Sequence, residues 1–247
     1  MRRILLFIFL FSAFNLFAQD AIEYKTPPKE IYDLVMAKLT PSVSFDHKGE
    51  WMLVMERSSM PPVEELAQPE LRIAGLRINP NNFGLSRTPF IINLILKDIK
   101  SGTEFPVTGL PKPLKAGNVQ WNPDENKIAF TQTSDHAIDL YIIDVKLRKA
   151  VKVNKTALNL VNGNAFDWID NNTLMYQTII KPYTAAPAKP LATKGPTVQQ
   201  NLGKVAASVT YQDLIKSPYD EALYEFYATS QLVKNSSGVE TKIGTAA

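Results

Sequence analysis

The 247-residue sequence contains no cysteine and only two histidines, and these shortages exclude several kinds of site. Without cysteine the chain can form neither a disulfide framework nor a lipid attachment through a thiol, so its stability must come from an apolar core. Two isolated histidines without carboxylates at helical spacing cannot supply a set of metal ligands. We therefore expect no metal site and no cofactor.

The residues of a serine hydrolase triad are also missing. The sequence contains no Gly-x-Ser-x-Gly nucleophile motif. His47 falls in an expected turn, where a histidine is usually a solvated surface group. His136 follows Ser134 and Asp135, but triad members come from separate elements and cannot usually assemble from neighbours in sequence. We predict no catalytic residue in this chain.

The charge balance gives no indication of a polyanionic partner. The 27 basic and 24 acidic residues leave a net charge of +3, and the basic residues are dispersed along the chain. Nucleic-acid binding usually needs a concentrated basic surface, often interleaved with aromatic residues. Nucleic acid is therefore not an expected partner.

The first 18 residues have the pattern of an export signal. Arg2 and Arg3 precede an uncharged apolar run at 4–17, and Ala18 supplies a small residue at its end. Such a run is too short to cross a hydrocarbon core of ~30 Å as a settled helix. We predict a signal peptide at 1–18 and a periplasmic or extracellular protein without a stable membrane span after signal cleavage.

Residues 19–40 are interpreted as an N-terminal extension with a short helix. Pro28 stands where a helix can start, and Ile31, Leu34 and Val35 share one helical face. We expect this helix to pack across a sheet edge or a domain boundary. A partner-binding helix is the alternative.

A hairpin pattern recurs three times in the rest of the chain. In residues 119–132, Trp121 closes one strand, Asn-Pro-Asp supplies a turn, and Ile128 begins the next strand. Residues 44–53 align with this pattern without gaps, and residues 166–176 align with one residue missing from the turn. A second hairpin follows each of them. Four short strands in a repeat of ~40–50 residues are typical of a propeller blade, which must stack on neighbours.

The predicted fold class is all-β: a partial β-propeller of about three four-stranded blades with short helical inserts. The incomplete propeller covers 41–247, and three blades do not close a ring. The expected boundaries are blades at about 41–109, 117–155 and 163–244, with proline-rich inserts at about 57–89 and 181–224.

Within the second insert, the sequence favours two short helical turns separated by Pro218. The third blade is then expected to resume at Glu225, with Phe226 and Tyr227 as strand aromatics.

The first insert contains the candidate binding residues. Pro62, followed by Glu64 and Glu65, is typical of a helix start, because carboxylates complement the positive end of the helix dipole. Arg77 and Arg87 come later, and a guanidinium on such an insert can pair bidentately with a carboxylate. Arginines that only brace a blade or lie on the surface remain the alternative.

Six further motifs extend over nearly all of the chain after the leader. They are Tyr-x-x-Pro-Pro-Lys-Glu-Ile at 24–31, Met-Pro-Pro-x-x-Glu-Leu-Ala-x-Pro-Glu at 60–70, Leu-Arg-Ile-Ala-Gly-Leu-Arg-Ile at 71–78, Gly-Pro-x-Val-Gln at 195–199, Gln-Asp-Leu-Ile-Lys at 212–216 and Tyr-Ala-Thr-Ser-Gln-Leu at 227–232. Together they resemble the amino-terminal region of the glutamyl endopeptidase branch of the prolyl oligopeptidase family.

The resemblance implies an exported serine peptidase in which an amino-terminal propeller gates and docks peptide substrates. The C-terminal α/β-hydrolase domain with the Ser-Asp-His triad is missing from this chain, which we therefore expect to be inactive alone. By the same resemblance, Arg77 or Arg87 helps to accept an acidic peptide side chain. The alternative is a stand-alone secreted propeller-like binding module that assembles through its open edges.

Overall fold

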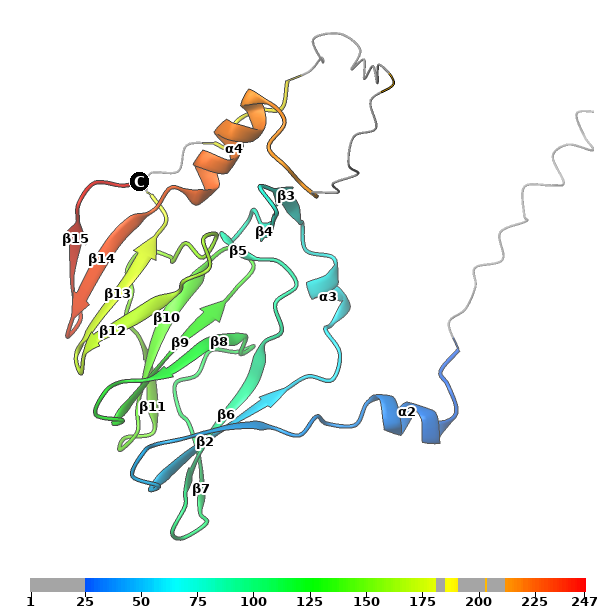
Figure 1. The fold of residues 1–247 in the computed structure, drawn as a ribbon. Helices are drawn as coiled ribbons and strands as arrows, with labels where there is room; N and C mark the ends of the chain where they lie inside the picture. Colours follow the sequence, from blue (N-terminus) through cyan, green and yellow to red (C-terminus); the bar gives the residue numbers. More distant parts are fainter. Residues whose placement is uncertain (1–24, 181–184, 191–202, 204–211) are drawn as a thin grey trace, which may run out of the picture. The chain divides into compact units, whose positions relative to one another are not determined.

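The structure is a computed structural model that describes residues 25–180, 185–190, 203 and 212–247 (Figure 1). The predicted signal peptide at 1–18 and much of the second insert lie outside these residues. The chain divides into two units, Met1–Ala37 and Lys38–Ala247. No helix in the described ranges is long and apolar enough to cross a membrane.

The first unit contains the helix α2 (Lys29–Val35), which begins directly after Pro28 as the sequence predicts. Its three apolar residues Ile31, Leu34 and Val35 are exposed. Packing of this helix on a sheet stays a prediction.

The second unit consists mostly of antiparallel strands, which confirms the all-β class. Twelve of its described strands form three antiparallel meanders of four strands each, in chain order. The first meander is β1 (Ser42–Phe45), β2 (Trp51–Arg57), β6 (Ile91–Asp98) and β7 (Glu104–Pro106). The second is β8 (Ala116–Trp121), β9 (Lys127–Thr133), β10 (Ile138–Asp144) and β11 (Lys149–Lys152). The third is β12 (Phe166–Asp170), β13 (Thr173–Thr178), β14 (Gln231–Ser236) and β15 (Val239–Ile243).

The meanders are joined by side-chain packing more than by strand pairing. Between the first two, the β6–β8 pairing consists of the single Cα pair Ile91 and Ala116. Alternate residues of β9 contribute to different cores: Ile128 and Phe130 belong to a core with the first meander, and Ala129 to a core with the third. The second meander therefore has buried apolar residues on both faces.

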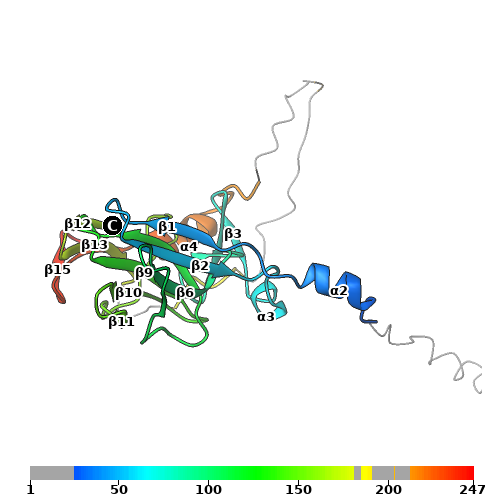
Figure 2. The ribbon, with the colours of Figure 1, turned by 90° about the horizontal axis from the view of Figure 1, so that it is seen from below.

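The two inserts pack against each other. The first forms α3 (Val63–Leu66) and a small sheet of β3 (Leu71–Ile73), β4 (Leu76–Asn79) and β5 (Gly84–Leu85), and the second forms α4 (Pro218–Ala228). Both views show α4 beside β3 (Figure 1, Figure 2). They share a third core made of Ile73, Ile78, Phe83, Val161, Ile179, Leu223 and Tyr227.

The prediction for the end of the second insert is only partly correct, since the helical turn expected after Pro218 is present but the helix starts earlier and ends later than predicted. Pro218 does not separate two helical turns but is the first residue of α4, whose N-cap is Ser217. The Ser217 hydroxyl accepts a hydrogen bond from the backbone N–H of Asp220, and a proline at the first helical position loses no bond that the helix needs. The helix then continues through Phe226 and Tyr227, so these aromatics are helical and the strand begins only at Gln231.

Candidate substrate-binding surface

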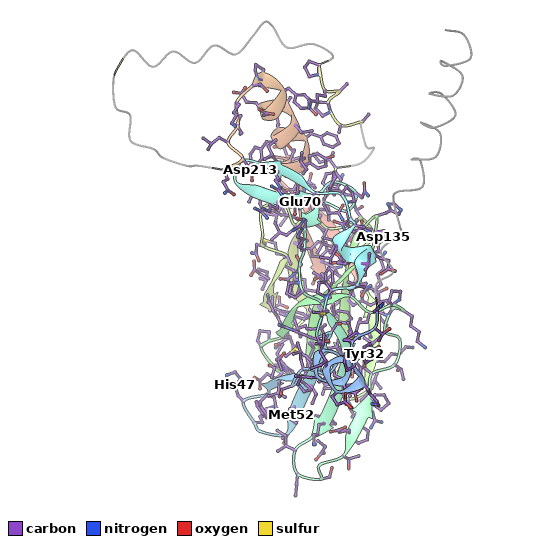
Figure 3. All side chains as sticks on the ribbon, turned by 90° about the vertical axis from the view of Figure 1, so that its right-hand side faces the viewer. Tyr32, His47, Met52, Glu70, Asp135 and Asp213 are labelled. Atoms are coloured by element: carbon purple, nitrogen blue, oxygen red, sulfur yellow. The ribbon has the colours of Figure 1, made fainter. Side chains whose placement is uncertain are left out.

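The candidate arginines lie on the small sheet of the first insert. Arg77 is exposed on β4 and stands directly opposite Arg72 on β3 in the strand register. Arg87 follows β5, and its side chain is 55% exposed. Figure 3 labels Glu70, beside these strands, and Asp213 of the second insert near it. The Gly75 N–H donates to the Asp213 carbonyl at 3.2 Å, which connects the β3–β4 turn to that insert.

Glu70 holds two of the three arginines. Its side chain is only 11% exposed, and it accepts hydrogen bonds from Arg72 Nε at 2.8 Å and from Ser86 Oγ at 2.8 Å. Arg87 Nε lies 3.2 Å from the second carboxylate oxygen. The Ser86 hydroxyl and then the Arg72 guanidinium hold the pKa of Glu70 below its ordinary value. Arg87 thus has a bracing partner within the insert.

Arg77 differs from its two neighbours because, in the part of the chain that the structure describes, it makes no ion pair. Glu70 pairs with the other two guanidinium groups, and like charges directly opposite each other on adjacent strands, as Arg72 and Arg77 are, repel. A carboxylate from another molecule would relieve this repulsion and can bind guanidinium in a bidentate manner. Sequence reasoning named the arginines but not Glu70, although its position two residues before Arg72 is a usable signal.

A cavity of about 760 Å³ opens between β3 and the first turn of α4. Its lining residues are Leu71, Arg72, Ile73, Lys189, Pro190, Ser217, Pro218, Tyr219, Asp220 and Leu223. Most of these side chains are apolar, and two of the polar ones are cationic. The two inserts together therefore form a concave surface next to the arginines. The sequence of neither insert alone predicts this surface.

The residues of the histidine-containing loop do not form a triad. The Ser134 hydroxyl donates to the Ala137 carbonyl at 2.9 Å and accepts from the Ala137 N–H, so it closes its own turn. Asp135 instead faces Lys115, 3.8 Å away, and Gln68. Among the described residues, no group of three His, Cys, Asp or Glu side chains is placed to hold a metal ion.

His47 makes a contact that its sequence neighbourhood does not predict. Its side chain is 95% exposed, as expected for a turn, yet its Nδ1 contacts Glu125 Oε1 and its backbone N–H donates to Glu125 Oε2 at 2.8 Å. Figure 3 places His47 and Met52 at the opposite end of the larger unit from Glu70 and Asp213. The pair connects the turns of the first and second meanders.

This pair predicts a pH dependence of stability. The hydrogen bond and charge of Glu125 raise the pKa of His47 above 6.5, and His47 lowers the pKa of Glu125 below 4.5. The stabilisation should therefore be present between pH 4.5 and 6.5, fall as pH rises through the raised pKa of His47, and fall again as Glu125 protonates in acid. Urea titrations of the wild type and His47→Gln should differ most within that window. A difference that grows toward alkaline pH would contradict the pairing, and Glu125→Gln should reproduce the His47→Gln profile.

Two plant proteins are similar to this chain over most of its length. The probable chloroplastic glutamyl endopeptidase of Oryza sativa subsp. japonica is 34% identical over 238 residues, which are 91% of this chain and 25% of the relative. The protein of the same name from Arabidopsis thaliana is 34% identical over 237 residues, with the same shares. The chain thus spans about a quarter of the length of these curated relatives. No protein-family model matches it.

Among solved structures, the acylaminoacyl peptidase of Pyrococcus horikoshii aligns with 85% of this chain and 26% of its own, at 8% identity and a TM-score of 0.39. A likeness at this level adds nothing to the description of the fold.

This chain, which is mostly antiparallel β, is therefore related in sequence to peptidases. More particularly, the resemblance to the glutamyl endopeptidases that the six motifs indicate is confirmed, since it extends over 91% of the chain.

Proposed function

We propose that this chain is the amino-terminal propeller portion of an exported serine peptidase, in which it gates and docks peptide substrates. The observation that carries the proposal is the 34% identity over 91% of the chain to two probable glutamyl endopeptidases. Because the chain spans only about a quarter of these relatives, the Ser-Asp-His triad is assigned to an α/β-hydrolase domain outside it. The signal-like residues 1–18 support a periplasmic or extracellular location.

The stacking of the meanders supports a propeller. Trp121 and Trp168 occupy equivalent positions in the second and third meanders, and each packs in the core shared with the preceding meander. Phe45 is their equivalent in the first meander, where its side chain is 54% exposed. In a propeller, a further blade covers this face.

The docking role centres on Arg77. Arg87 is braced by Glu70, whereas Arg77 is exposed, faces Arg72 and makes no ion pair within the described residues. A peptide carboxylate at Arg77 would supply the counter-charge that the arginine cluster lacks. We therefore assign Arg77 to the recognition of an acidic substrate side chain and give Arg87 a supporting role through Glu70.

The test is substrate preference in the complete protein encoded by the reading frame that contains this chain. Arg77→Gln should lower kcat/KM for a glutamate-containing peptide by about 10- to 100-fold, because a charge-assisted hydrogen bond is lost. The value for the matching glutamine peptide should change little. Arg57→Gln, which changes an exposed arginine on β2, is the matched control. An unchanged preference for glutamate would remove Arg77 from this role.

A stand-alone binding module remains the second candidate, favoured by exposed apolar residues on β1. Val43 and Phe45 are 46% and 54% exposed, and such a face invites assembly with other chains. A fluorophosphonate probe separates the candidates: labelling of a serine in the complete protein, together with cleavage of peptides, supports the peptidase. A complete protein that contains no labelled serine but forms stable oligomers supports the binding module.

A further inference from the structure

The cavity between the inserts has the size and lining of a ligand site. Its volume of about 760 Å³ lies within the usual range for ligand pockets, which are mostly apolar with a few placed polar groups. Ile73 and Leu223 are 3% and 6% exposed and belong to the core of the inserts. Pro218 and Tyr219, from the start of α4, complete an apolar wall. A large apolar side chain bound here would cover Pro218 and Tyr219, which are still accessible to water.

Among the described residues that line the cavity, Lys189 is the cation left for a ligand. Ser217 is occupied as the cap of α4, and the Asp220 carboxylate accepts from the Lys216 N–H at 2.9 Å. Arg72 and Lys189 also line the cavity, and within the described residues Lys189 makes no ion pair. The lining therefore combines an apolar wall with Arg72, which Glu70 already pairs, the Asp220 carboxylate and the unpaired Lys189. The wall and Lys189 suit an apolar group that is accompanied by a carboxylate.

We propose that this cavity receives a large apolar side chain of the peptide, adjacent to the acidic residue that the arginines accept. The inference rests on the proposed function and adds a second specificity element to it. Arg72 both lines the cavity and stands opposite Arg77. Opposite residues on paired strands are about 5 Å apart, and one extended peptide residue spans about 3.5 Å. A carboxylate at the arginines thus leaves the neighbouring residue of the peptide within reach of the cavity.

Peptide binding to the full chain tests the two elements separately. Three fluorescein-labelled peptides share one sequence except at two central positions, which are Glu-Leu, Glu-Ala or Gln-Leu, and binding is followed by fluorescence anisotropy. We expect saturable binding of the Glu-Leu peptide with a Kd of about 1 mM or tighter. Glu-Ala should bind about tenfold more weakly, because the cavity stays unfilled. Equal affinity for Glu-Leu and Glu-Ala, or no saturable binding, overturns the inference.

The third peptide distinguishes this inference from the proposed function. If Gln-Leu binds as tightly as Glu-Leu, carboxylate recognition fails while the apolar cavity stands. If Glu-Ala equals Glu-Leu but Gln-Leu is weaker, the cavity fails and carboxylate recognition stands.

A surface variant provides the protein-side test without disturbing the core. Lys189→Glu should weaken Glu-Leu binding about tenfold, since it reverses an exposed charge at the cavity. Lys242→Glu makes the same change on an exposed residue of β15 and should have no effect. Equal affinities of the two variants would show that the peptide does not bind beside Lys189 and would overturn the placement.

Discussion

Gly109→Ala is expected to lower the free energy of unfolding by about 3 kcal/mol, by adding steric overlap to backbone strain. Gly109 has a φ of +75°, and a Cβ there would lie 2.4 Å from the backbone carbonyl oxygen of Ala150. This obstacle is main chain and cannot rotate away. Gly109 follows Thr108, whose N–H and carbonyl bond to Arg148 and Ala150 of the second meander at 2.9 and 2.8 Å.

Gly102→Ala separates the steric overlap of the added Cβ from the backbone strain. Gly102 has a φ of +72°, but a Cβ there would meet no atom within 4 Å. Its substitution should therefore cost only the left-handed strain, about 1 kcal/mol. Urea denaturation of both variants gives the comparison. Equal losses would mean that the loop at Gly109 does not press against β11, and the contact between the first two meanders would have to be described differently.

The local hairpins could be predicted because their signals are local. The aromatic residue, the turn residues and the following strand all lie within about ten residues, where turn chemistry decides the conformation. The structure has the strand pairs β1–β2, β8–β9 and β12–β13 at these three positions.

The difference at α4 has a local cause. Proline interrupts a helix at interior positions but is favoured at the first helical position, which Pro218 occupies. Asp220 and Glu221 in the first turn, with Ser217 before them, are the pattern of a helix start. The aromatic residues Phe226 and Tyr227 suited a strand equally well, so helix capping was the only discriminating signal.

The cavity between the inserts and the His47–Glu125 contact could not be predicted, because the parts of each are distant in sequence. Leu71 and Leu223 line one cavity from different inserts, and no pattern within either insert specifies the other. His47 and Glu125 are 78 residues apart, so a turn histidine that should be merely solvated has a partner. Such contacts depend on how the meanders stack, which hydrophobic periodicity does not determine.

Trp121→Ala should destabilise the chain by about 3 kcal/mol, the lower part of the range for a buried aromatic residue, because Trp121 is only partly buried. Its ring packs on the core between the first two meanders, and its Nε1 donates to Ser44 Oγ at 2.9 Å. The substitution removes both the apolar contact and this hydrogen bond across the interface.

Two milder variants separate the contribution of the apolar contact of Trp121 from that of its hydrogen bond to Ser44. Trp121→Phe keeps much of the apolar contact and should cost about 1 kcal/mol for the lost hydrogen bond. Ser44→Ala removes the acceptor and should cost a similar amount, and the double variant Ser44→Ala/Trp121→Phe should cost less than the sum, because both changes remove one bond. Strict additivity would show that the two side chains do not interact. A Trp121→Ala loss of only a few tenths of a kcal/mol would count against stacking of the meanders through their aromatic positions, since that stacking places Trp121 between the first two meanders.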